Sequence, residues 1–452
     1  MDQPTENPAE RASSAEQVVL SLVERGQAQQ AAWAVADLRA ADGAAIVAQL
    51  EPQQQIDLVR LLEPDRTAQL LAHLDTDAAV AIVEALDDGV VPEILDLTSP
   101  DVAADILHAF PPERLQRTID AMVRAGDVAS LLPYEDESAG GLMVPDFVVL
   151  REWMTSEEAI AYLRGAKPPA ESSNYLFVLD RRNALSGVVN LRDLVLAQAD
   201  TVVRDLMDSD VITVKPGTDQ EECARVMARY DLVQLPVADD QNQVLGVILS
   251  GDIIDVMEDE ATEDMMLLAS IGQGERVLGP FRRGFRARLP WLLLNLGTVL
   301  MAAAIINIFE STIAGAAFLA VFLPMVASQG GIAGTQTLTL VTRGLALGEL
   351  TLAHSARLLR REVALGLVNG VIFGLIAGAL AYAWKGNADL GIVVGVAMVL
   401  NLLVAGTFGA LVPLGLRAFR LDPALGSAVL VTTFTDMAGF GFVLSLAAWR
   451  LG

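Results

Sequence analysis

Five long apolar stretches follow one another in the C-terminal part of the chain, and a largely polar region precedes them. Each stretch is near or above the length of about 20 residues that a helix needs to cross a bilayer. The stretches cover roughly residues 289–309, 313–341, 363–384, 390–416 and 425–448. This pattern predicts a membrane domain of five helices behind a polar N-terminal region.

A short repeat occupies the first part of the polar region. In residues 50–122 a large apolar side chain recurs at about every twelfth position. Several units open with a proline or an aspartate, which favours the first turn of a helix. Such short helices bury their apolar faces only by stacking, so the repeat predicts an all-α superhelix, with an ordinary helical domain as the alternative. The repeated positions are Leu50, Leu62, Leu74, Leu86, Leu97 and Phe110.

A longer duplication follows the helical repeat. Residues 175–195 align with a segment 59 positions later, and the preceding segments align at an offset of 64, which predicts an extra loop around Lys167–Ser173. Runs of β-branched residues between polar turns predict strand, helix, strand, turn, strand and helix in each copy. The pattern resembles a tandem pair of CBS domains over about 140–258, which implies a regulatory sensor of nucleotides or ions. Aligned pairs include Val178 with Val237 and Gly187 with Gly246.

Charge divides the chain in the same way as hydropathy. The formal net charge is −26; residues 1–275 contain 51 acidic and 18 basic residues, whereas residues 276–452 contain 6 and 13. The acidic half argues against nucleic acid as a partner, because phosphate binding requires clustered Lys and Arg. The single cysteine, Cys223, excludes an internal disulfide and suits a reducing cytosol. The polar N-terminus has no apolar signal core, so the first span is expected to direct insertion.

Basic residues predict the orientation in the membrane. Eleven of them flank the start of the first span and the ends of the second and fourth, against only Lys385 and Arg450 on the other side. The positive-inside rule then predicts a cytoplasmic N-terminus and an external C-terminus in the cell (inner) membrane. Trp291, Trp384 and Trp449 fall near the ends of predicted spans, where tryptophan is common.

Asp436 lies near the middle of the last apolar stretch, about 17 Å along a helix that starts at Leu425. A carboxylate at that depth costs at least about 2.5 kcal/mol, so it is retained where it faces a cavity, an ion or a partner. We expect a pathway for cations. The alternative is a protonated aspartate that joins two helices by a hydrogen bond.

The second and third stretches contain unusual small and polar residues. The segment SQGGIAGTQTLT interrupts the second stretch and is expected to bend and to line a cavity or a helix interface. Glycine at every fourth position of the third stretch predicts close packing against another helix, and suggests dimerisation. The pore-lining candidates are Gly330, Gly331, Thr335 and Gln336, and the glycine stripe is Gly366, Gly370, Gly374 and Gly378.

An acidic segment, SGDIIDVMEDEATEDM, follows the duplication and leads towards the first span. Carboxylates spaced by three or four residues share one helix face and repel one another unless cations lie between them. The segment is therefore a candidate sensor of divalent ions, and a solvated acidic helix is the alternative. The residues on that face are Asp252, Asp255, Asp259 and Glu263, with Glu260 and Asp264 beside them.

Together these features resemble the MgtE family of magnesium channels over nearly the whole chain. The most specific matches are YEDESAGGLM (134–143), EATEDM (260–265), GGIAGTQ (330–336) and TDMAG (435–439). The resemblance implies a multidomain protein with an all-α N-terminal superhelix, an α/β tandem CBS pair and a five-helix α membrane domain. The implied boundaries are 1–138 for the helical domain, 139–258 for the CBS pair, 259–284 for an acidic connecting helix and 285–452 for the membrane domain.

The resemblance also implies a function. It implies a homodimer that carries Mg²⁺ into the cytosol along its twofold axis, with a hydrated ion held by Asp436 and the carbonyl of Thr432. The acidic segment then closes the pore when Mg²⁺ is plentiful, with Asp101 and Asp105 as candidates for the facing carboxylates. The CBS pair is a candidate site for a nucleotide such as ATP.

Two departures from the family pattern bear on the ion selectivity and on the charge of the sensor face. Ile332 stands where the family usually has Asn, and Gly251 where it often has an acidic residue. The alternatives are a transporter selective for Mn²⁺ or Co²⁺, a membrane-anchored CBS-type sensor that does not transport, and a proton-coupled carrier. An enzyme is not expected, because His73 and His108 are isolated in the helical repeat and His354 lies in a basic loop. The sequence also shows no nucleophile–base grouping and no phosphate-binding loop.

Overall fold

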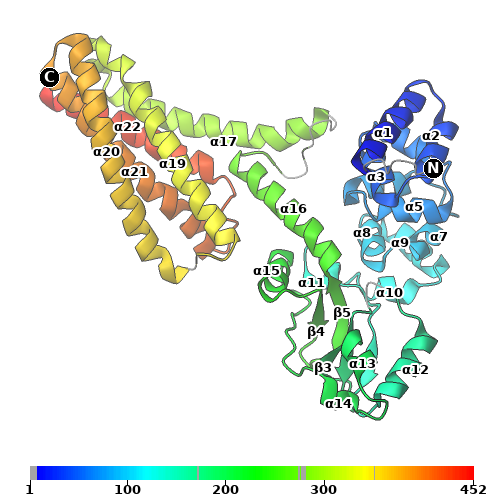
Figure 1. The fold of residues 1–452 in the computed structure, drawn as a ribbon. Helices are drawn as coiled ribbons and strands as arrows, with labels where there is room; N and C mark the ends of the chain where they lie inside the picture. The colour runs from blue at the N-terminus through cyan, green and yellow to red at the C-terminus, as the bar shows by residue number, and fades with distance from the viewer. Residues whose placement is uncertain (1–7, 170–172, 273–274, 276–280, 351, 452) are drawn as a thin grey trace, which may run out of the picture. The chain divides into compact units, whose positions relative to one another are not determined.

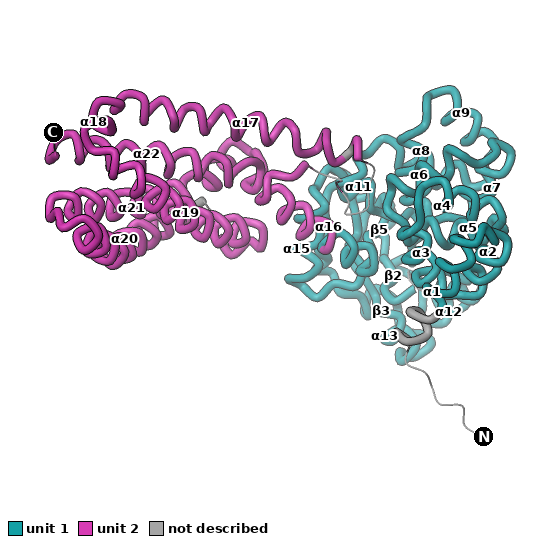
Figure 2. The backbone as a smooth tube through the Cα atoms, turned by 90° about the horizontal axis from the view of Figure 1, so that it is seen from above, with its two compact units in different colours: residues 1–257 teal, residues 258–452 magenta. Residues whose placement is uncertain are grey.

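The computed structural model describes residues 8–169, 173–272, 275, 281–350 and 352–451 (Figure 1). The chain forms two compact units, residues 1–257 and 258–452 (Figure 2). The first unit holds the helical repeat and the duplicated α/β domains, and the second holds the apolar helices. Helix α16 (Ser250–Leu268) begins in the first unit and ends in the second.

The N-terminal repeat consists of short stacked helices, as the twelve-residue period predicts. Helices α4, α5 and α6 begin at Pro52, Pro64 and Thr76. The side chain of Asp75 caps α6 by accepting a hydrogen bond of 3.0 Å from the amide of Ala78, an arrangement that stabilises a helix by about 1 kcal/mol. The helices are α1 (Pro8–Glu24), α2 (Ala28–Ala36), α3 (Ala40–Ala48), α4 (Pro52–Val59), α5 (Pro64–Leu71), α6 (Thr76–Glu84), α7 (Val91–Leu97), α8 (Pro100–His108), α9 (Pro112–Ala121) and α10 (Ala125–Ala129).

The two α/β copies share one strand register. Val178 pairs with Gly187 between β2 and β3, and Val237 pairs with Gly246 between β4 and β5, which are the positions that the duplication aligns. In the second copy the first strand is reduced to a single bridge between Val214 and Val237. The elements are α11 (Ala139–Leu142), β1 (Val149–Arg151), α12 (Ser156–Ala166), β2 (Tyr175–Leu179), β3 (Leu185–Asn190), α13 (Leu191–Leu196), α14 (Val203–Leu206), α15 (Gln220–Tyr230), β4 (Gln234–Ala238) and β5 (Val244–Leu249).

The first copy builds a three-stranded sheet in the order β1-β2-β3, with β1 parallel and β3 antiparallel to β2. A methyl group on Gly187 would lie 2.7 Å from the sulfur of Met207, and one on Gly246 would lie 2.8 Å from Cγ of Met143. In each copy, the absence of a side chain at the glycine therefore lets a methionine side chain pack against the β-hairpin at the equivalent position. The predicted extra loop around Lys167–Ser173 falls partly on residues 170–172, which are outside the described residues.

The second unit contains the five predicted spans. Helices long and apolar enough to cross a membrane cover Gly284–Ile308, Ala317–Ala346, Ser355–Lys385, Ala388–Ala418 and Ser427–Arg450, close to the predicted stretches. The elements are α17 (Phe281–Ile308), α18 (Glu310–Gly315), η1 (Ala317–Val321), α19 (Leu323–Ala346), η2 (Leu352–His354), α20 (Ser355–Lys385), α21 (Ala388–Ala418) and α22 (Ser427–Arg450).

The expected bend at the paired glycines of the second span is wrong. Helix α19 runs without a break through Gly330 and Gly331, and the irregular part of this span is the 3₁₀ segment η1 before it. A methyl group on Gly330 would lie 2.2 Å from Nδ2 of Asn401, and one on Gly334 would lie 2.6 Å from Cγ1 of Val431. The glycines therefore let neighbouring helices approach a regular helix.

The glycine stripe of α20 packs against α21, as close helix packing predicts. A methyl group on Gly374 would lie 2.6 Å from the carbonyl oxygen of Gly395, and one on Gly378 would lie 2.6 Å from that of Gly391. Because α21 of the same chain covers the stripe, the suggestion that it mediates dimerisation is wrong.

Candidate functional site

Asp436 lies in the middle of α22, one helical turn after Thr432, and is partly buried. The hydroxyl of Thr435 donates a hydrogen bond of 3.0 Å to the carbonyl oxygen of Thr432. The hydroxyl of Thr432 is turned back along its own helix, where it lies 2.9 Å from the carbonyl oxygen of Ala428. At Thr432 a ligand would therefore meet a carbonyl group that is already polarised by a hydroxyl donor.

The polar segment of α19 meets α22 at this level. A methyl group on Gly331 would lie 3.9 Å from Cγ2 of Thr432, so these two predicted site residues are neighbours. The hydroxyl of Thr335 donates a hydrogen bond of 2.9 Å to the carbonyl oxygen of Gly331. The other two predicted residues lie outside this contact. Gly330 is buried against α21, and Gln336 lines a separate cavity.

This cavity has a volume of about 160 Å³ and lies among α19, α20 and α21. Its polar wall includes Glu362, which is 4% exposed and accepts a hydrogen bond of 3.1 Å from the hydroxyl of Thr337. The guanidinium of Arg361 lies 3.3 Å from the same carboxylate. Glu362 was not predicted from the sequence, because the third apolar stretch was placed from residue 363 onwards. The signal that could have indicated it is the single acidic residue inside the basic run RLLRREV.

Asn401 of α21 is a second buried polar residue that was not predicted from the sequence. Its side chain is fully buried, and Nδ2 donates a hydrogen bond of 2.8 Å to the carbonyl oxygen of Val326 on α19. Its amide also lies against two glycines, Gly330 of α19 and Gly439 of α22. Within the described residues, its Oδ1 has no hydrogen-bond partner. Asn401 thus contacts both neighbouring membrane helices, α19 and α22, about one turn along α22 from Asp436. In the sequence, the single amide side chain in an otherwise apolar span could have indicated such a role.

In the first unit, Asp101 and Asp252 come close enough to influence each other. Burial raises the pKa of Asp252 to about 7, and the charges of Asp101 and Asp255 contribute. One oxygen of Asp252, Oδ2, is buried and has no partner among the residues that the structure describes. Burial also raises the pKa of Asp101, although Ser99 donates a hydrogen bond to its carboxylate. Two crowded carboxylates with an orphaned oxygen fit a hard divalent cation such as Mg²⁺, which prefers oxygen ligands.

The remaining predicted sensor residues lie on the same helix, α16. Asp255 is exposed in the first unit. The others belong to the part of α16 in the second unit, where Asp259 is exposed and the other three are partly buried. The predicted acidic helix is confirmed over Ser250–Leu268, but it ends at Leu268 and does not continue to residue 284 as the implied connecting helix would. These residues are Asp259, Glu260, Glu263 and Asp264.

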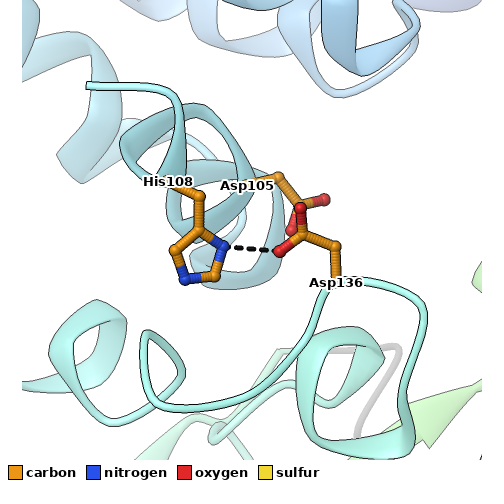
Figure 3. Close-up of side chains that lie close together, drawn as sticks. All are labelled: Asp105, His108 and Asp136. Carbon is orange, nitrogen blue, oxygen red and sulfur yellow. Dashed lines mark hydrogen bonds and ion pairs between the residues drawn. The ribbon is translucent and has the colours of Figure 1, made fainter. Parts of the chain in front are cut away.

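A histidine-containing cluster also lies in the first unit (Figure 3). Asp105 and His108 of α8 and Asp136 of the segment before α11 bring their ligand atoms within 4.8 Å of one another. Nδ1 of His108 lies 2.5 Å from Oδ1 of Asp136, and Nε2 lies 3.0 Å from the carbonyl oxygen of Leu132. The expectation that His108 is isolated is therefore wrong, because the fold brings a residue 28 positions away against it.

The ionisation of this cluster is strongly perturbed. Burial raises the pKa of Asp105 to about 7, and the charges of Asp136 and Asp101 add to the effect, while His108 opposes it. Burial lowers the pKa of His108, but the hydrogen bonds with Leu132 and Asp136 outweigh it and raise the pKa overall. The carboxylates therefore repel one another where no cation separates them.

A five-helix membrane unit with a carboxylate in its last helix, preceded by a CBS pair and an acidic helix, is an arrangement typical of a membrane transport protein. A family model described as "Divalent cation transporter" (MgtE) matches residues 323–446, the "MgtE intracellular N domain" matches 38–137, and a "CBS domain" matches 203–259. The chain belongs to the MgtE family of magnesium transporters, which are not enzymes.

Two relatives support this assignment by sequence identity and coverage. "Magnesium transporter MgtE" of Thermus thermophilus is 38% identical over 338 residues, which is 74% of each chain. The protein of the same name from Enterococcus faecalis is 36% identical over 324 residues, 72% of this chain and 71% of the relative. The structure titled "cytosolic domain of the Mg2+ channel MgtE in complex with ATP" is 34% identical, with a TM-score of 0.49, and covers 53% of this chain and 99% of that one.

Proposed function

We propose that this protein is a channel-type importer of Mg²⁺, with the ion passing Asp436 and the carbonyl group of Thr432. The observation that carries the proposal is the position of Asp436 in the middle of α22, one turn from Thr432 and the α19 crossing at Gly331. Mg²⁺ gives up its water reluctantly, so a pore that keeps the hydration shell avoids a large barrier. A single carboxylate and a carbonyl group attract a hydrated ion without trapping it.

The homodimer and the pore position are part of the proposal. Only 6% of the apolar part of α17 is buried against the rest of the chain. On α19, Ile332 and Thr335 lie three residues apart on one exposed face, with Ile332 54% exposed. These surfaces support a second copy whose α19 and α22 face the first, with Asp436 of each copy near the shared axis.

The direction of transport follows from the proposed orientation. Eleven basic residues flank one side of the spans and two flank the other, which supports a cytoplasmic N-terminus. A membrane potential of about 100 mV, negative inside, then favours entry of a divalent cation by roughly 4.6 kcal/mol.

Gating is proposed to depend on the cytosolic carboxylates. Without cations, Asp101 and Asp252 repel each other, and the orphaned Oδ2 of Asp252 lacks a partner among the described residues. A bound Mg²⁺ would neutralise this pair and hold α8 against α16. Because α16 leads along the chain towards α17, the proposed signal reaches the membrane unit through this connection.

The test is Mg²⁺ uptake into liposomes that contain the purified protein and an internal Mg²⁺ indicator. We expect uptake by the wild type and uptake near background by Asp436→Ala. Glu310→Gln, which removes an exposed carboxylate elsewhere in the membrane unit, is the matched control and should transport like the wild type. Wild-type uptake by Asp436→Ala would overturn the proposed pathway.

The same vesicles separate the remaining alternatives. Uptake of Mn²⁺ or Co²⁺ but not Mg²⁺ would point to a transporter of different selectivity. No uptake of any of these ions, with the CBS side free of divalent cations, would favour a sensor that does not transport.

A further inference from the structure

We propose that Asp105, His108 and Asp136 form a binding site for a divalent transition-metal ion of the Zn²⁺ and Co²⁺ class. The three side chains bring one ligand atom each within 4.8 Å of one another (Figure 3). This site is separate from the Asp436 pathway and from the oxygen-only Asp101–Asp252 pair. Its existence does not depend on the proposed transport, whereas any effect on gating does.

The second nitrogen of His108 supports a metal-binding role. Nε2 lies 3.0 Å from the carbonyl oxygen of Leu132, which can only accept a hydrogen bond. Nε2 therefore carries a proton, so Nδ1 presents a lone pair towards Asp136 whenever the ring is neutral, as it is once a metal ion displaces the second proton. Histidines that bind metals usually donate their other ring N–H to a carbonyl or carboxylate group, which fixes the ring orientation.

The pair formed by His108 and Asp136 requires a positively charged bridge. Nδ1 and Oδ1 of Asp136 lie 2.5 Å apart, and both are acceptors when the ring is neutral and the carboxylate ionised. Either a proton or a metal ion must lie between them. Ligand atoms bound to Zn²⁺ at about 2.0–2.2 Å lie roughly 3.4 Å apart in a tetrahedron, so only small side-chain rotations convert the cluster into a coordination site.

The backbone holds the ligands in place before any ion binds. Asp105 and His108 are three residues apart on α8 and share one face of the helix. Asp136 lies in a tight segment, because a methyl group on Gly141 would lie 2.5 Å from the carbonyl oxygen of Asp136. Ser138 closes this segment by donating a hydrogen bond of 2.6 Å from its hydroxyl to the carbonyl oxygen of Glu135.

The ligand chemistry selects against Mg²⁺. One imidazole with two carboxylates suits Zn²⁺, Co²⁺ and similar borderline ions, whereas Mg²⁺ prefers an all-oxygen octahedron. The charge of Asp101 influences both sites, because it contributes to the raised pKa of Asp105 and of Asp252. An ion at the cluster would therefore alter the field at the proposed Mg²⁺ site.

The test is a Co²⁺ titration of the full-length protein, purified without metals in detergent and kept in millimolar Mg²⁺ to fill oxygen-only sites. Visible absorption reports Co²⁺ that has a nitrogen ligand and low coordination number. We expect one such Co²⁺ per chain in the wild type, displaced by Zn²⁺. His108→Gln and Asp136→Asn should each weaken binding by at least about tenfold.

Three further variants keep the outcome specific. His73→Gln removes an exposed histidine from the same helical repeat and should leave the titration unchanged. His108→Cys supplies a thiolate in place of the imidazole and should restore binding with a shifted spectrum, which a misfolded variant could not do. Asp436→Ala should bind Co²⁺ normally, so failure of the pore proposal and failure of this one are distinguishable.

Unchanged Co²⁺ binding by His108→Gln would overturn the proposal, as would a wild type whose Co²⁺ spectrum vanishes in millimolar Mg²⁺. The first result would place the ion at other residues. The second would mean that the cluster has no preference for a nitrogen-favouring ion.

Discussion

Replacing Asp252 by Asn tests whether the carboxylates of Asp101 and Asp252 destabilise the folded protein when no cation is bound. The pKa of Asp252 is raised from 3.8 to about 7, mainly by burial and then by Asp101. At 1.36 kcal/mol per pH unit, this difference corresponds to roughly 4 kcal/mol of cost for the ionised carboxylate. Because the residue is only partly buried, solvent screening reduces the cost, and we expect the substitution to stabilise the Mg²⁺-free protein by about 2 kcal/mol at pH 8.

The pH dependence has a defined sign. A carboxyl whose pKa is higher in the folded than in the unfolded state costs nothing below pH 3.8, costs progressively more between pH 4 and 7, and reaches its full cost above about pH 7. The advantage of Asp252→Asn should therefore be largest at pH 8 and should shrink towards pH 5. Bound Mg²⁺ should instead favour the wild type. At about 100 times its Kd, a ligand stabilises the folded protein by about 2.7 kcal/mol, and Asp252→Asn should lose much of this stabilisation.

The assay is thermal unfolding of the full-length protein in detergent, followed by the fluorescence of tryptophans such as Trp33 and Trp153 in the first unit. The wild type and Asp252→Asn are compared at pH 5 and 8, with and without Mg²⁺. Asp200→Asn, an exposed carboxylate of the same unit, is the control and should change neither the midpoint nor the response to Mg²⁺. A lower midpoint of Asp252→Asn at pH 8 without Mg²⁺ would refute the reasoning.

Three further predictions concern the membrane unit. Gly334→Val should force α19 and α22 apart, because even a methyl group would lie 2.6 Å from Val431; we expect uptake to fall and stability in detergent to drop by about 1–3 kcal/mol. Asn401→Leu removes the hydrogen bond to the carbonyl oxygen of Val326 and should cost about 1–3 kcal/mol, measured as a lower unfolding midpoint, together with reduced uptake. Ile332→Asn should change the ratio of Mg²⁺ to Co²⁺ uptake in liposomes, since an exposed apolar branch on α19 is replaced by an amide that contacts hydration water; an unchanged ratio would place Ile332 outside the pathway.

Periodic features of this fold could be predicted because local packing determines them. The twelve-residue repeat located α4, α5 and α6, and the duplicated segments predicted the shared pairing of Val178 with Gly187 and of Val237 with Gly246. The five spans follow from hydropathy alone. The domain boundaries and the site roles remain predictions.

Other features depend on contacts between distant residues and could not be predicted. His108 and Asp136 meet only because α8 packs near the segment before α11, and no spacing in the sequence indicates this. The paired glycines of α19 suggested a bend, but glycine permits either a bend or a close helix contact, and Asn401 lies against Gly330 in the second arrangement. Glu362 is buried inside a span because Thr337 provides a hydrogen-bond partner from another helix.

Helices of the membrane unit differ in how closely they pack against their neighbours, and this difference has a mechanical consequence. Helices α20 and α21 touch backbone to backbone along their glycines and form a stiff frame, whereas α17 is only lightly attached. The ring of Trp291 on α17 lies against Gly426, where a methyl group would lie 2.7 Å from Cζ3, and φ of +63° also favours glycine. Gly426 is the N-cap of α22. A tilt of α17 would therefore act as a lever on the start of the helix that carries Asp436, while the rest of the frame resists deformation.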